Sequence, residues 1–175
     1  MITIIIVTSI LAAFALAGTL FYLLAKRYFE NQQKQQLLQM KIDERRETLK
    51  VVTPIRLQAY ERMALFLERI SPNSLVLRCY QPGMDLRLLQ GVMTKNIRDE
   101  WEHNLSQQVY VSSELWTSIR EAKDEMVNLV NSAAVSLPDT DDPTRLAATI
   151  FASAADHMPT DDALETLHKE LKELF

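Results

Sequence analysis

The first 25 residues have a different pattern of side chains from the rest of the chain. Residues 2–25 include no charged side chain and read ITIIIVTSILAAFALAGTLFYLLA. As an α-helix this stretch would extend about 36 Å, enough to cross a hydrocarbon core of about 30 Å. A cleavable signal peptide would have a basic start and a shorter apolar region, although Ala15-Leu16-Ala17 resembles a cleavage site. The pattern predicts an uncleaved transmembrane anchor over residues 1–25.

The flanks of this stretch predict its orientation. Lys26 and Arg27 follow it directly, and no Lys or Arg precedes it. The positive-inside rule then places the amino terminus outside and the carboxy-terminal domain in the cytoplasm. Ser9, Ala13 and Ala17 are four residues apart, a spacing of small residues that allows close packing of membrane helices.

Residues 26–53 read as a helical stalk that continues the first helix. They contain no Pro or Gly and five Gln, which favours an unbroken helix. The apolar positions Leu38, Ile42, Leu49 and Val52 are too few for a sustained heptad repeat. A solvated helix is the simpler interpretation, and a short dimeric coiled coil is the alternative.

From residue 54 onward, apolar residues recur at spacings of three and four, as in amphipathic helices. Thr53-Pro54 is typical of a helix start. The predicted helix caps are Asp85, either Ser112 or Ser113, and Thr160. Residues 81–83 are predicted to form a turn. Residues 109–111 read as a brief extended link. The predicted core comprises Leu57, Tyr60, Met63, Ala64, Leu67, Ile70, Leu75, Val76, Leu77, Leu86, Leu89, Met93, Ile97, Trp101, Leu105, Leu115, Trp116, Ile119, Ala122, Met126, Leu129, Val130, Ala133, Leu146, Ala147, Ile150, Phe151, Ala154, Leu164, Leu167, Leu171 and Leu174.

Alternation of apolar and polar residues never extends beyond three positions, so no strand is predicted. The fold class is therefore all-α: a transmembrane helix, a helical stalk, and an antiparallel helical bundle. Within the domain of residues 54–175, residues 54–137 form the main bundle and residues 138–175 an acidic helical pair. This pair either packs on the bundle or docks a partner.

Charge divides unevenly along the chain, whose formal net charge is −4. Residues 26–53 carry seven basic and four acidic side chains. Residues 54–175 carry twelve basic and nineteen acidic side chains. An acidic body does not suggest a nucleic-acid partner. Cys79 is the single cysteine, so no intramolecular disulfide forms, and an inert buried thiol is the favoured interpretation.

One spacing resembles a metal site. Glu100-x-x-His103 and Glu165-x-x-His168 match the pairs used in di-iron carboxylate bundles. Further ligands would come from Glu61 or Glu68 and from Glu121 or Glu125. His103, however, lies two positions from the core residue Trp101, which turns it away from the bundle interior. We predict no catalytic, cofactor-binding or metal residue and no cofactor.

Histidine, aromatic and arginine side chains elsewhere in the chain are further candidates for a functional role. His157 reads as a helix-end residue that interacts with terminal carbonyls. Tyr60, Trp101 and Trp116 lie on apolar stripes and read as core. Arg56, Arg62 and Arg69 either pair with Glu61 and Glu68 or bind a partner.

The segments TPIRLQAYERMALFLERISPNSLVLR, QPGMDLRLLQ and IRDEWEHNLSQQVYVSSELW resemble a family of short bacterial proteins, catalogued as a domain of unknown function. Residues 57–69 and 102–112 are the most specific part of a resemblance that covers nearly the full length. It implies one amino-terminal membrane helix, a helical body and a bacterial inner-membrane setting. It implies no activity, cofactor or site residue.

The function expected from these features is that of a non-enzymatic, membrane-anchored adaptor or scaffold at the bacterial inner membrane. It would contact the lipid bilayer through residues 2–25 and bind a protein partner or itself. The alternatives are a structural subunit that packs through its transmembrane helix, and a metal-binding bundle that uses the two Glu-x-x-His pairs. No small-molecule substrate is evident.

Overall fold

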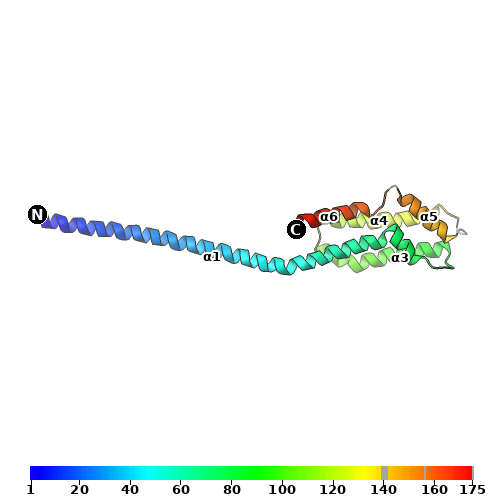
Figure 1. Ribbon diagram of the computed structural model, residues 1–175, viewed down its shortest axis with the longest axis horizontal. Coiled ribbons are helices and arrows are strands. Elements are labelled where there is room, and N and C mark those ends of the chain that lie inside the picture. Colours follow the sequence, from blue (N-terminus) through cyan, green and yellow to red (C-terminus); the bar gives the residue numbers. More distant parts are fainter. Residues whose placement is uncertain (139–141, 156, 175) are drawn as a thin grey trace. The chain divides into compact units, whose positions relative to one another are not determined.

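The computed structural model describes the backbone of residues 1–138, 142–155 and 157–174, and the side chains of these residues except at 3, 7–9, 12 and 13. Every regular element in these ranges is helical: six α-helices and one 3₁₀ helix (Figure 1). The all-α prediction is confirmed for the described residues. The small-residue spacing of Ser9, Ala13 and Ala17 involves two side chains outside this description.

Helix α1 runs without a break from Ile2 to Ile70. The predicted continuation of the first helix into residues 26–53 is confirmed, but the predicted helix start at Thr53-Pro54 is wrong because Pro54 lies inside α1. Proline removes one backbone donor and frees the carbonyl four residues earlier. Here that carbonyl belongs to Lys50, an exposed residue, so water can satisfy it.

The chain divides into two compact units, Met1–Val52 and Thr53–Phe175, called unit 1 and unit 2 below. Unit 1 consists of the first part of α1. Unit 2 holds the last turns of α1 and all later elements.

The predicted membrane anchor is not supported. Among the residues that the structure describes, no helix is long and apolar enough to cross a membrane. A span requires about 20 consecutive, mostly apolar residues. The predicted transmembrane helix, and the single-pass inner-membrane localisation with the amino terminus outside, are therefore wrong.

Unit 2 contains α2 (Pro72–Cys79), α3 (Leu86–Asn104), η1 (Leu105–Val109), α4 (Ser113–Val135), α5 (Pro143–Ala154) and α6 (Asp161–Leu174). Two predicted caps are confirmed: Asp85 accepts a hydrogen bond from Leu88 N at 2.7 Å, and Ser112 accepts one from Leu115 N at 3.0 Å. Each satisfies a backbone donor that the first helical turn leaves free. Gly83 makes the predicted turn before α3, with φ of 89°.

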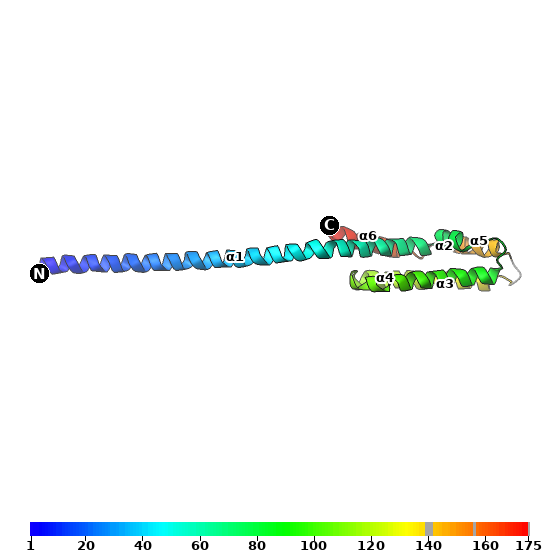
Figure 2. The same cartoon turned by 90° about the horizontal axis from the view of Figure 1, so that it is seen from below.

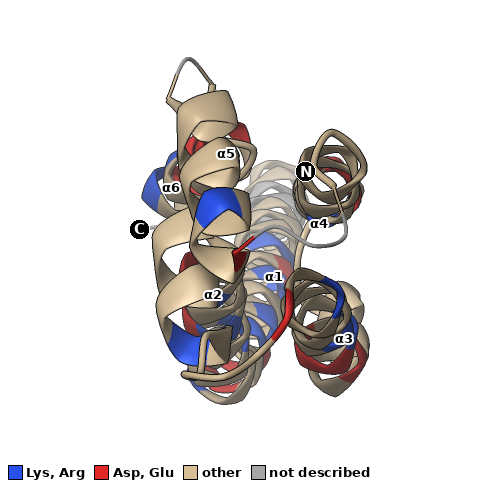
Figure 3. Ribbon diagram, turned by 90° about the vertical axis from the view of Figure 1, so that its right-hand side faces the viewer, with Lys and Arg blue, Asp and Glu red and all other residues tan. Residues whose placement is uncertain are grey.

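The helices of unit 2 form two layers. Figure 2 shows α3 and α4 in one layer and the last turns of α1 with α2, α5 and α6 in the other, and Figure 3 shows the same division end-on. One hydrophobic core lies between the layers, and each described helix of the unit except η1 contributes to it. The acidic pair α5–α6 packs on α4, so it belongs to the bundle.

Most of the predicted core is buried, with exceptions at helix ends and edges. Leu57 is 47% exposed, Leu77 79%, Leu105 39%, Phe151 37% and Leu174 38%. Phe66, which the periodicity missed, is buried. The predicted extended link at residues 109–111 is also wrong, because Val109 ends the 3₁₀ helix η1 and Tyr110 after it has a helical backbone conformation, with φ of −107° and ψ of −11°.

The predicted Thr160 cap is not made by its side chain. Leu164 N donates to the Thr160 carbonyl at 3.0 Å, but the buried Thr160 Oγ1 has no hydrogen-bond partner among the described residues. Desolvation of the hydroxyl is therefore uncompensated at the start of α6.

Candidate functional site

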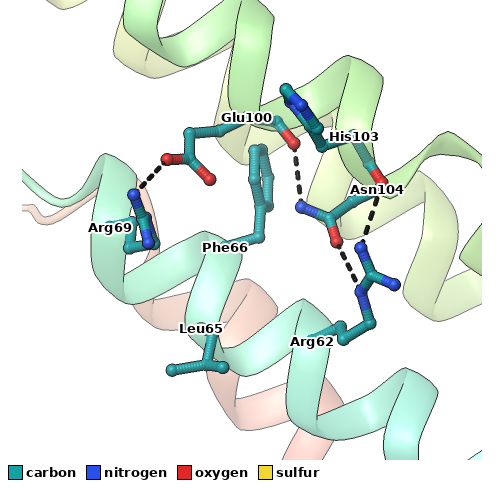
Figure 4. A pocket seen from close by; sticks show the side chains of 7 residues that line it. All are labelled: Arg62, Leu65, Phe66, Arg69, Glu100, His103 and Asn104. Carbon is teal, nitrogen blue, oxygen red and sulfur yellow. Dashed lines mark hydrogen bonds and ion pairs between the residues drawn. The ribbon is translucent and has the colours of Figure 1, made fainter.

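One hollow in the polar surface of unit 2 is a pocket between α1 and α3. It has a volume of ≈ 350 Å³ and is lined by Arg62, Leu65, Phe66, Arg69, Glu100, His103 and Asn104. We call it the arginine pocket (Figure 4). Helix α1 supplies the arginines and α3 supplies the acceptors that face them.

One carboxylate in this pocket serves two guanidinium groups. Glu100 Oε1 lies 2.7 Å from Arg69 Nη2 and 3.4 Å from Arg78 Nη1. Arg78 Nη2 also donates to the Arg69 carbonyl at 2.8 Å. The group of three therefore retains one excess positive charge, and the Arg69 side chain is 53% exposed.

The acceptors that Arg62 contacts in this pocket are neutral. Its Nε donates to Asn104 Oδ1 and its Nη2 to the His103 carbonyl, both at 3.3 Å. Asn104 is held in place because its Nδ2 donates to the Glu100 carbonyl at 2.8 Å. With Arg69 nearby, the pocket is a cationic surface suited to an anionic group of a partner.

The predicted pairing of the arginines on the first body helix with Glu61 and Glu68 is wrong. Arg62 and Arg69 contact α3, and no ion pair joins Glu61 or Glu68 to a cation in the described ranges. The physical reason is spacing, since side chains meet along a helix at three or four residues. Neither glutamate stands at that distance from Arg56, Arg62 or Arg69.

A second polar cluster joins α1, α4 and α6 around Glu170. Its Oε1 accepts from the Tyr60 hydroxyl at 2.5 Å and from Ser112 N at 3.0 Å, and its Oε2 accepts from Ser112 Oγ at 2.6 Å. Arg56 lies 3.8 Å from Glu170 and donates to the Tyr60 hydroxyl at 3.0 Å and the Tyr110 carbonyl at 3.1 Å. We call this the Glu170 cluster.

The Glu170 cluster changes the acidity of its tyrosine. Burial, the hydrogen bond to Glu170 and its negative charge raise the pKa of Tyr60 to about 12, against the opposing effect of Arg56. Tyr60 is core, as predicted, but its hydroxyl is also a structural donor. Sequence inspection missed Glu170 because its partners lie 58 and 110 residues away.

The Glu-x-x-His motifs are not assembled into a metal-binding group. No set of three or more His, Cys, Asp and Glu side chains within the described residues is placed to hold a metal ion. Glu100 pairs with arginines, and His103 Nδ1 lies 2.6 Å from the Asp99 carbonyl. Glu165 and His168 are exposed on α6.

The remaining candidate side chains are structural. Cys79 is buried, and burial raises the pKa of its thiol against the opposing charge of Arg78, which matches the inert thiol expected. His157 was predicted to interact with helix-end carbonyls, but among the described residues its partner is a carboxylate on α4, since its Nε2 lies 3.8 Å from Glu125 Oε2. Trp101 and Trp116 stack at 4.6 Å and pack against the core.

Unit 1 presents a different kind of surface. Among the side chains that the structure describes between residues 2 and 25, thirteen large apolar ones are each half or more exposed. They are Ile2, Ile4, Ile5, Ile6, Ile10, Leu11, Phe14, Leu16, Leu20, Phe21, Tyr22, Leu23 and Leu24. We call residues 2–25 the apolar arm. Contiguous apolar surface of this extent is unusual on an isolated chain and marks interaction sites.

These features define an all-helical protein that combines a compact bundle with an exposed apolar helix. The chain belongs to the Family of unknown function (DUF7935), whose model matches residues 1–174. The resemblance to a family without an assigned function is thereby confirmed. No curated protein and no solved structure matches the chain.

Proposed function

We propose that this protein is a non-enzymatic scaffold that assembles with helical segments of other protein chains through the apolar arm. The observation that carries this proposal is the exposure of thirteen large apolar side chains in residues 2–25. Fully burying a Leu, Ile or Phe side chain contributes about 1.5–3 kcal/mol. A partner that covers even half of this surface has a large driving force for association.

The distribution of these side chains around the helix indicates what kind of surface the partner presents. Apolar residues occupy every side of the arm, since positions 20 to 24 hold Leu20, Phe21, Tyr22, Leu23 and Leu24 in succession. A helix that is apolar on all sides is stable when other elements surround it. The partner surface is therefore apolar and helical, and it is provided by more than one segment.

Contacts in unit 2 support a role without chemistry. Glu100 pairs with two arginines, and Glu170 accepts three hydrogen bonds that join three helices. Tyr60 has a raised pKa, which makes its hydroxyl a poorer acid. These groups hold the bundle together, and a protein of this kind acts by positioning its partners.

Site-specific photo-crosslinking in cells tests the proposal. The full chain is produced with p-benzoylphenylalanine at position 21, where Phe21 is 75% exposed, and separately at position 77, where Leu77 is 79% exposed. We expect protein adducts at position 21 whose cross-linked peptide is an apolar helical segment, and few at position 77. Equal yields at both positions, or no protein adduct at position 21, would refute the proposal.

A further inference from the structure

We propose that unit 2 carries a second, separate association surface, through which two copies of this chain form a parallel two-fold dimer. The surface comprises Glu61, Arg62, Leu65, Glu68 and Arg69 on α1, and we call it the charged stripe. All five side chains are exposed, and the residues between them are buried or half-buried. The inference does not depend on the apolar arm.

The charged stripe has opposite charges on its two sides. At about 100° per residue, Arg62 and Arg69 lie about 40–60° to one side of Leu65, and Glu61 and Glu68 lie equally far to the other side. Leu65, which is 54% exposed, occupies the centre line. One flank is thus basic and the other acidic, along two helical turns.

This arrangement is self-complementary in one orientation. When two copies of α1 pack in parallel about a two-fold axis, the basic flank of each faces the acidic flank of the other. Arg62 then lies level with the second copy's Glu61, and Arg69 with the second copy's Glu68. In a parallel pair, such flanking charges determine partner and orientation.

The antiparallel orientation would join like charges. Reversal of one helix places the two basic flanks together, with Arg62 beside the second copy's Arg69. It also places Glu68 beside the second copy's Glu61. Like charges in such positions are destabilising, so the pattern selects the parallel dimer.

The charges on this surface are not balanced within one chain. Arg62 donates to the neutral oxygens of Asn104 and His103, and Arg69 shares Glu100 with Arg78. Glu61 and Glu68 form no ion pair with any described residue. A second copy would supply a carboxylate to each of these arginines and a guanidinium group to each of these glutamates.

The size of the surface sets the strength of the dimer. A stable interface buries about 1,600 Å² in total. The charged stripe offers one large apolar side chain and four charged ones over about two turns, which is well below that area. We therefore expect a weak, reversible dimer that depends on ionic strength.

Reciprocal charge reversal tests this dimer. The full chain carries Leu20→Ser, Phe21→Ser and Leu24→Ser, so that association through the apolar arm is weakened. We measure sedimentation equilibrium of this protein, of its Arg62→Glu variant, of its Glu61→Arg variant and of their equimolar mixture. Each variant alone should self-associate about tenfold more weakly, because two opposite-charge pairs become like-charge pairs. The mixture should recover the original affinity.

Matched controls alter charge elsewhere. Arg120→Glu on α4 and Glu102→Arg on α3 change the net charge by the same amounts at exposed positions, and both should leave the dimer unchanged. Failure of the mixture to recover affinity would overturn the proposal, as would a parent protein that stays at 20.1 kDa at every concentration. Tighter association of the Arg62→Glu variant alone would identify the antiparallel arrangement instead.

Discussion

Glu170 is the side chain whose removal should most disturb the junction between α1, α4 and α6. It accepts hydrogen bonds from the Tyr60 hydroxyl, Ser112 N and Ser112 Oγ, at 2.5, 3.0 and 2.6 Å. Its side chain is 16% exposed. In the Glu170→Ala variant these three donors lose their acceptor together. The loss of stability is therefore larger than that caused by replacing an exposed glutamate.

The magnitude follows from the geometry. A hydrogen bond to a charged group contributes about 1.5–3 kcal/mol, and bonds to one acceptor do not add fully. The pair with Arg56 spans 3.8 Å, and that arginine is 35% exposed, so its own contribution is small. We expect Glu170→Ala to lower the free energy of unfolding by about 3 kcal/mol. Glu170→Gln keeps one oxygen acceptor and should lose less than half as much.

Urea unfolding followed by tryptophan fluorescence measures this effect, because Trp101 and Trp116 both lie in unit 2. A loss of about 3 kcal/mol would move the midpoint by about 1–2 M urea. Glu173→Ala, which removes an exposed glutamate from the same helix, is the matched control and should stay within about 0.5 kcal/mol of the parent. If Glu170→Ala unfolds at the same midpoint as Glu173→Ala, the Glu170 cluster contributes nothing and our reasoning is wrong.

Three further predictions concern named positions in unit 2. Since folding raises the pKa of Tyr60 from 10.0 to about 12, the contribution of its neutral hydroxyl to the free energy of unfolding is complete below pH 10 and is lost as the pH rises through 12. Urea titrations should show a loss of about 1.4 kcal/mol of stability at pH 11. Tyr60→Phe should abolish this part of the dependence of stability on pH. Asp85→Ala should cost about 1 kcal/mol in thermal or urea unfolding by removing the bond to Leu88 N, whereas Asp85→Asn should cost much less. Thr160→Val should leave stability unchanged or raise it by about 1 kcal/mol, because no described residue forms a hydrogen bond with the buried hydroxyl; a loss above 1 kcal/mol would show that it has a partner.

The helical bundle was predictable because its signals are local. The spacing of Leu86, Leu89, Met93 and Ile97 identifies the buried side of α3, and all four are fully buried. Asp85 identifies the start of that helix for an equally local reason, since its carboxylate caps the first turn. Leu57 and Leu105 follow the same spacing but are partly exposed. Periodicity indicates a direction, and it does not indicate where the neighbouring helix ends.

The polar contacts were not predictable because they depend on tertiary packing. Glu170 meets Tyr60 across 110 residues, and no local pattern relates the two. Arg62 and Arg69 are recognisable in the sequence as cations of the first body helix, but only the packing of the helices shows that their acceptors lie on α3. The apolar arm illustrates the opposite error, since its composition suggested a membrane span that the described helices do not contain.

The measurement that tests the central claim most directly is the mass of the assembly that contains the full chain. Sedimentation velocity of extracts prepared under native conditions compares the natural chain with the Leu20→Ser, Phe21→Ser, Leu24→Ser variant. Leu77→Ser, which polarises an equally exposed side chain in unit 2, serves as the control. We predict that the natural chain and the Leu77→Ser control sediment in assemblies well above 20.1 kDa, and that the triple variant sediments at one or two chains. A natural chain that sediments as a 20.1 kDa monomer would contradict the scaffold function.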